Sequence, residues 1–158
     1  MLVSRKIKII LFVVAFVALG FAREYLFVSI NDLLYYKYSG EINPYHFVIE
    51  KWLTVFSYNT LYIAKWFITP LSAFIFWFVQ KQFLLFLFNE KKTTQWLNVL
   101  YATLFVLAGI FFVVGWAFGN IEKGYTFSRL FMGLLQSPVA CMILIPITFL
   151  YTHQSQNK

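Results

Sequence analysis

Four long apolar stretches, separated by short polar connections, follow one another along the chain. They cover about residues 7–30, 59–88, 96–118 and 127–151. A hydrocarbon core of about 30 Å is crossed by about 20 helical residues at about 1.5 Å each, so every stretch is long enough to span a bilayer. The pattern predicts an all-α fold, an integral membrane bundle of four transmembrane helices that forms one domain over residues 1–158.

The segment between the first two stretches, residues 31–58, mixes charged and aromatic residues and is predicted to lie outside the membrane. Apolar residues recur there at three- and four-residue spacing, which favours a short amphipathic helix lying on the outer surface. An ordinary loop is the alternative interpretation. The residues that set the spacing are Phe47, Val48, Trp52, Val55 and Phe56.

The N-terminal stretch has two interpretations. A basic segment precedes the apolar run, as in a secretory signal, and Gly20-Phe21-Ala22 supplies a small-x-small cleavage pattern. However, the apolar character resumes at Tyr25, so a helix over about residues 7–30 can span. We expect an uncleaved first transmembrane helix.

Two features mark the last two spans. Gly115 and Gly119 form a GxxxG pattern that favours a close helix contact, although glycine is common in such helices. Pro138 and Pro146 interrupt the fourth span, and neighbouring helices or hydroxyl groups must then satisfy the freed carbonyls. Gln136, Ser137 and Thr148 are polar enough to line a path but more often bond to nearby backbone, and Cys141 is expected to be inert packing.

Composition supports the membrane assignment. The chain is 61% hydrophobic and only 12% charged, whereas a soluble domain has about 25% charged residues. The chain has a net charge of +7, but its positively charged residues lie between the apolar spans and form no basic helix. Nucleic acid is therefore not an expected partner. The basic N-terminus and the basic connection 89–95 favour a cytoplasmic position for both termini. No cofactor or metal site is expected, since His46 and His153 lie far apart and Cys141 is the single cysteine.

The charged residues near the predicted outer ends of the spans are the candidates for function. Arg23 lies in the outer half of the first span, and Glu24 and Asn31 share a different face of that helix from Arg23. We therefore expect Arg23 to meet another helix. A polar cluster between helix ends is one hypothesis, and separately hydrated side chains reaching the interface are the other. The candidate binding residues are Arg23, Glu24, Asn31, Asp32, Tyr58, Asn59, Lys65 and Arg129.

The first half of the chain resembles a family of small proteins. The resemblance rests on Arg23-Glu24-x-Leu26-Phe27, on Leu33-Leu34, on an aromatic segment with Pro44, on Tyr58-Asn59-Thr60, and on Ser72; Asn31-Asp32 stands where an Asp-Pro pair is expected. In these features the chain is similar to the multi-pass proteins associated with exosortase systems of Gram-negative bacteria, of the exosortase F or exosortase X associated type. The resemblance implies an accessory protein beside a membrane cysteine transpeptidase, in the bacterial inner membrane.

Two functional hypotheses follow. The first is a non-enzymatic inner-membrane accessory subunit that contacts membrane lipids and binds an integral-membrane protein partner, because a polar cluster occurs without a catalytic set. The second is a small transporter or membrane enzyme in which Arg23 and Arg129 hold an anionic lipid or a lipid-linked substrate, since guanidinium groups bind phosphate in a bidentate manner.

Overall fold

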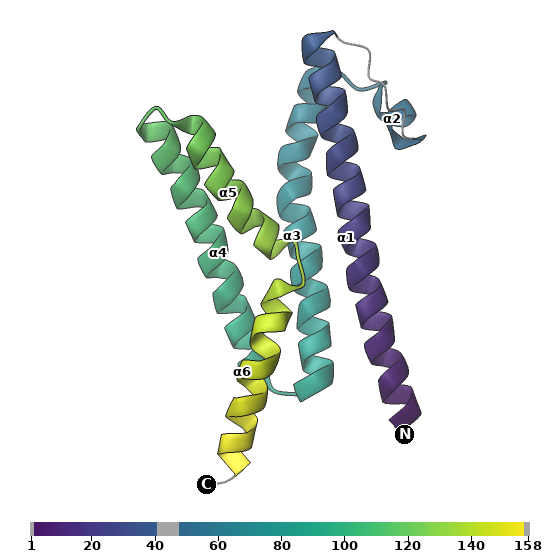
Figure 1. Ribbon diagram of the computed structural model, residues 1–158, viewed down its shortest axis with the longest axis vertical. Helices are drawn as coiled ribbons and strands as arrows, with labels where there is room; N and C mark the ends of the chain where they lie inside the picture. Colours follow the sequence, from purple (N-terminus) through teal and green to yellow (C-terminus); the bar gives the residue numbers. More distant parts are fainter. Residues whose placement is uncertain (1, 41–47, 157–158) are drawn as a thin grey trace. The chain divides into compact units, whose positions relative to one another are not determined.

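The computed structural model describes residues 2–40 and 48–156, and the regular elements in those ranges are six helices, α1 to α6 (Figure 1). Three of them, α1 (Leu2–Ser39), α3 (Tyr58–Phe88) and α4 (Lys91–Ala117), are long and apolar enough to cross a membrane. A fourth crossing is added if α5 (Ile121–Leu135) and α6 (Val139–Gln156) form one bent span. The predicted all-α fold is confirmed, with three or four long apolar helices that could span a membrane.

The chain divides into two compact units, and each is described by itself. One unit is Val17–Ser72, which holds the second part of α1, the short helix α2 and the first part of α3. The other combines Met1–Phe16 with Ala73–Lys158, and so contains the start of α1, the rest of α3, and α4 to α6.

Helix α1 is longer than the predicted first span. The prediction ended it near residue 30, but the helix continues to Ser39 and ends at Gly40, whose φ is +72° and whose N–H donates to Tyr36 O at 2.9 Å. No glycine or proline occurs between residues 30 and 40, so nothing stops the helix where its apolar face ends. The first nine residues of the predicted outer segment therefore belong to α1.

The buried core of the unit Val17–Ser72 joins α1 to the start of α3. Ile30, Leu33, Leu34 and Leu61 are buried together, and three half-buried residues pack against them: Leu26, Leu53 and Ile68. Leu53 comes from α2 (Val48–Leu53), which has only six residues. Val55 and Phe56 follow its end, and Phe47 lies outside the described residues. The amphipathic character of this helix stays a prediction.

In the other unit, α3 and α4 are joined by a much shorter connection than predicted. Residues 89–95 were expected to link the two spans, whereas α4 already begins at Lys91. Asn89, with a φ of 53°, ends α3, and its N–H donates to Leu85 O at 2.9 Å. Since lysine, threonine and glutamine are all compatible with a helix, the polar residues after Glu90 form the first turn of α4 rather than a loop.

Helices α4 and α5 form a close hairpin (Figure 1). At Gly115 an added Cβ atom would lie 2.5 Å from the Cα of Gly124, so only two glycines permit this approach. The turn is also tighter than the predicted one over residues 120–126: Gly119, with a φ of +68°, lies in it, and α5 begins at Ile121. Gly115 therefore makes a helix contact, but with Gly124 in α5, and Gly119 is a turn residue.

The predicted fourth span is two helices rather than one. α5 ends at Leu135, α6 starts at Val139, and the two axes are bent by 56° at the break. Pro138 lies in this break, whereas Pro146 is accommodated inside α6. The structure thus places the main interruption at residues 136–138.

Candidate functional site

An exposed row of aromatic rings runs along one face of the first part of α3. Tyr58, Tyr62 and Trp66 are spaced by four residues, and successive ring centroids lie 6.3 and 6.4 Å apart. Tyr38, near the end of α1, continues the row with its ring 6.5 Å from that of Tyr58. We call these four residues the aromatic ladder. All four side chains are exposed, from 38% for Tyr58 to 82% for Tyr38.

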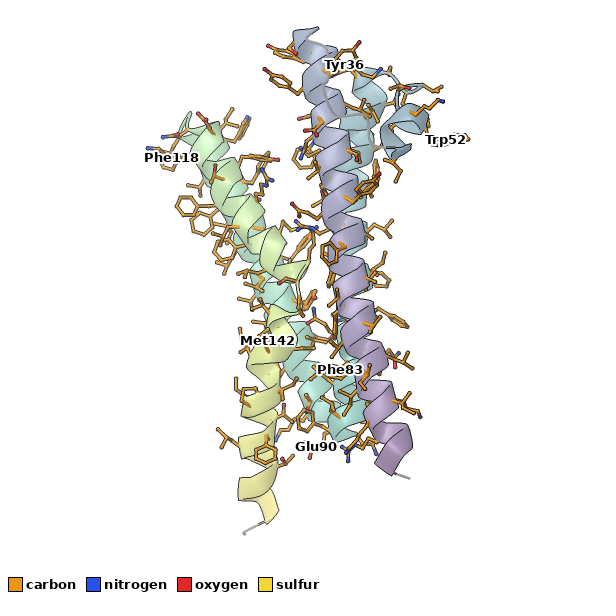
Figure 2. All side chains as sticks on the ribbon, turned by 45° about the vertical axis from the view of Figure 1, so that its right-hand side comes forward. Tyr36, Trp52, Phe83, Glu90, Phe118 and Met142 are labelled. Carbon is orange, nitrogen blue, oxygen red and sulfur yellow. The ribbon has the colours of Figure 1, made fainter. Side chains whose placement is uncertain are left out.

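The ladder is fixed by the hydrogen bonds and packing of the helix ends around it. Ser57 caps α3, since its Oγ accepts from Thr60 N at 3.3 Å and lies 2.8 Å from Thr60 Oγ1. Lys37 Nζ donates to Thr54 O at 3.1 Å and so connects α1 to the residues after α2. Trp52 of α2 adds a further exposed aromatic side chain. Figure 2 labels Trp52 and also Tyr36, which lies near the end of α1. These bonds fix the backbone of the helix ends that carry the rings.

Arg23 and Glu24 form an ion pair, which corrects the predicted divergence of their side chains. Arg23 Nη1 lies 3.3 Å from Glu24 Oε2, and the guanidinium carbon lies 5.4 Å from the centre of the Phe27 ring. Consecutive residues on a helix point about 100° apart, but the long arginine side chain spans that angle. Because the opposite charges are paired, the cost of holding them in an apolar helix is lowered.

The remaining predicted residues are spread over both units. Asn31 and Asp32 are half-buried in α1, Tyr58 and Asn59 are exposed in the first turn of α3, and Lys65 is half-buried one turn before Thr69. Arg129 is exposed in α5, which belongs to the other unit. His46, which was considered for a metal site, lies outside the described residues. A clamp formed by Arg23 and Arg129 stays a prediction.

A partly buried polar network holds the break between α5 and α6. Gln80 of α3 is fully buried, and its Nε2 donates to Ser137 O at 2.8 Å and to Tyr101 Oη at 2.9 Å. The Tyr101 hydroxyl donates in turn to Leu135 O at 2.8 Å, and Ser137 Oγ donates to Leu134 O at 2.8 Å. The carbonyls at the break are therefore satisfied by side chains of two neighbouring helices, α3 and α4, and by a local hydroxyl, as the sequence predicted.

Cys141 lies beside this network. It is buried, and its Sγ is 3.9 Å from the backbone oxygen of Gln80. Thr148, one of the residues considered for a polar path, is fully buried in α6. Within residues 2–40 and 48–156, no group of three or more histidine, cysteine, aspartate or glutamate side chains is placed to hold a metal ion.

The residues of the ladder and of the network were largely missed by the sequence interpretation. Tyr62 and Trp66 carry a readable signal, since with Tyr58 they repeat every four residues and so share one helix face. Gln80 is a polar residue inside an apolar span, which is itself a sign of an interhelical bond. Comparisons of the chain with protein-family models, with curated proteins and with solved structures found no match.

Proposed function

We propose that this chain is a non-enzymatic subunit of a membrane complex and that it binds an integral-membrane protein partner through the aromatic ladder. The observation that carries the proposal is the direction of the ladder. From Tyr58 to Trp66 the exposed rings extend along the helix axis rather than around it. Tyrosine and tryptophan are enriched in protein interfaces, where they supply large contact areas.

The depth covered by the ladder favours protein contact over a role as an interfacial belt. Eight residues of helix cover about 12 Å at about 1.5 Å each. A bilayer about 40–45 Å thick around a core of about 30 Å leaves about 5–8 Å for each headgroup layer. The ladder is longer than the headgroup layer is deep, so some of its rings lie outside that layer. A partner helix that packs along α3 accounts for those rings better than a headgroup belt does.

The polar break in the last two helices supports a subunit rather than a transporter. Transporters use broken helices to offer free carbonyls and amides to a substrate or ion. Here the carbonyls of Leu134, Leu135 and Ser137 already accept hydrogen bonds from the protein. The pairing of Arg23 with Glu24 likewise offsets the positive charge that the second hypothesis needs for an anionic substrate.

We further propose four membrane crossings, with both termini in the cytoplasm of a bacterial cell and the protein in its inner membrane. A bend of 56° supports one broken span for α5 and α6, because a re-entrant loop has to reverse its direction. An even number of crossings then places both termini on one side, where the positive-inside rule puts the basic N-terminus. The resemblance of the first half of the chain makes an exosortase-type enzyme the partner to test first.

Isolation of the tagged protein from its native membrane in a mild detergent tests the proposal. We expect a complex in which one membrane protein is present in a fixed ratio to this chain and remains through size-exclusion chromatography. Recovery of the chain only by itself, over a range of mild detergents, would contradict the proposed function. The identity of the companion protein tests the exosortase hypothesis separately.

A further inference from the structure

Five cations gather around the turn between α3 and α4. α1 supplies Arg5, Lys6 and Lys8, and α4 begins with Lys91 and Lys92. All five side chains are exposed, and we call them the basic end. Glu90 is the single carboxylate in this turn, so five positive charges and one negative charge leave a net charge of +4.

Two contacts join the cations of α1 to the end of α3. Arg5 Nη2 donates to Leu87 O at 3.3 Å, and Lys8 Nζ lies 5.7 Å from the centre of the Phe86 ring. Below them, Phe12 packs on Phe83 with ring centroids 5.1 Å apart. The start of α1 is thus fixed beside the end of α3, only a few residues before Lys91 in the chain.

Lys92 is held in position by α6. Its Nζ donates to Tyr151 Oη at 2.5 Å and lies 4.6 Å from the centre of the same ring. Trp96 packs edge-on against Tyr151, with ring centroids 5.3 Å apart. One lysine of the basic end is therefore preorganised, and the conformational entropy lost when it binds an anion is reduced.

The charge of the basic end is not balanced by the protein. Among the described residues, none of the five cations lies within ion-pair distance of a carboxylate oxygen. The first turn of α4 contains no acidic residue, and Glu90 makes no side-chain cap bond to it. Two lysines at a helix N-terminus repel the positive end of the helix dipole, and an anion bound there removes this unfavourable term.

We propose that the basic end binds the phosphate headgroup of an anionic phospholipid. The cations stand where the apolar runs of α1, α3 and α4 begin or end, which is the depth of the phosphate groups in a bilayer. Clusters of four to eight lysine and arginine residues beside membrane spans attract anionic lipids, with about 1 kcal/mol for each cation near the surface. This inference does not depend on the proposed partner.

Native mass spectrometry of the delipidated full-length chain tests the proposal, with phosphatidylglycerol and phosphatidylcholine titrated separately. We expect phosphatidylglycerol to be retained in preference. The variant K91Q/K92Q should lose this preference, with an affinity for phosphatidylglycerol lowered by about fivefold for each lysine, or about 25-fold in all. The variant K91R/K92R keeps the charge and should keep the preference.

The matched control is K51Q/K123Q, which removes the same charge from exposed lysines in α2 and α5. It should retain phosphatidylglycerol like the unchanged protein. The proposal is overturned if both lipids bind equally to the unchanged protein, or if the control variant loses the lipid as strongly as K91Q/K92Q. Thermal unfolding of each variant in the same detergent shows that the comparison is made between folded proteins.

Discussion

The side-chain amide of Gln80 donates a hydrogen bond of 2.8 Å to the backbone carbonyl of Ser137, 57 residues further along the chain. The bond joins α3 to the break between α5 and α6 and gives a donor to a carbonyl that lies between these two helices. A break in an apolar helix is tolerated only when such groups find partners. Gln80 is therefore a structural residue of the break between α5 and α6.

Replacement of this amide should destabilise the protein. We expect Q80L to lower the free energy of unfolding by about 1–3 kcal/mol, because the half-buried Ser137 carbonyl loses its donor. The measurement is helicity by circular dichroism during titration with a denaturing detergent in mixed micelles. Q82L is the matched control, since Gln82 is exposed on the same helix and its replacement should change stability by less than about 0.5 kcal/mol. Equal effects of the two variants would contradict the role of Gln80.

Tyr101 should be coupled energetically to Gln80. Its hydroxyl accepts from Gln80 and donates to Leu135 O, so Y101F removes part of the same network. In a double-mutant cycle with Q80L, we expect the two losses of stability to be non-additive by at least about 0.5 kcal/mol. Additive effects would show that the two side chains act separately.

Replacement by alanine at two glycines of α4 should change the stability of the protein in opposite directions. G115A places a Cβ atom 2.5 Å from the backbone of Gly124, and the resulting separation of α4 and α5 should cost about 1–3 kcal/mol. At Gly109 an added Cβ meets nothing within 4 Å, so G109A should stabilise the helix by about 0.5–1 kcal/mol. The same unfolding titration measures both. A similar loss of stability at the two positions would contradict a stabilising role of the close contact between Gly115 and Gly124.

Truncation of the aromatic ladder should weaken partner binding without unfolding the chain. In Y58A/Y62A two exposed rings are removed, and central interface aromatics contribute more than about 1 kcal/mol each. We expect at least a tenfold loss of the companion protein in purification from native membranes. F105A/F118A removes two exposed rings from the other unit and serves as the control, with unchanged recovery. Phe118 is labelled in Figure 2.

The long apolar helices could be predicted because their signals are local. The prediction for α3 differs from the structure by one residue at its start, where Ser57 caps the helix, and by none at Phe88. The extension of α1 to Ser39 was not predicted, because the prediction ended the helix with its apolar run near residue 30. Hydropathy predicts where a helix leaves the membrane, whereas the helix itself ends at Gly40, whose positive φ terminates it.

Pairings between distant residues could not be predicted from one sequence. The need for donors at the break beside Pro138 was evident, but nothing local connects Ser137 with Gln80 or Leu135 with Tyr101. The ion pair of Arg23 with Glu24 was missed for a different reason, since helix geometry describes Cβ directions and not the reach of a long side chain. The ladder was readable from its four-residue spacing.

Site-specific photocrosslinking in native membranes tests the docking role of the ladder most directly. A photoreactive phenylalanine analogue is placed at position 62 in the ladder or, as the control, at position 105 on the exposed face of α4. We predict one crosslinked membrane protein of defined mass from position 62 and none of that mass from position 105. Crosslinks to lipid alone from position 62, or the same protein products from both positions, would contradict the account.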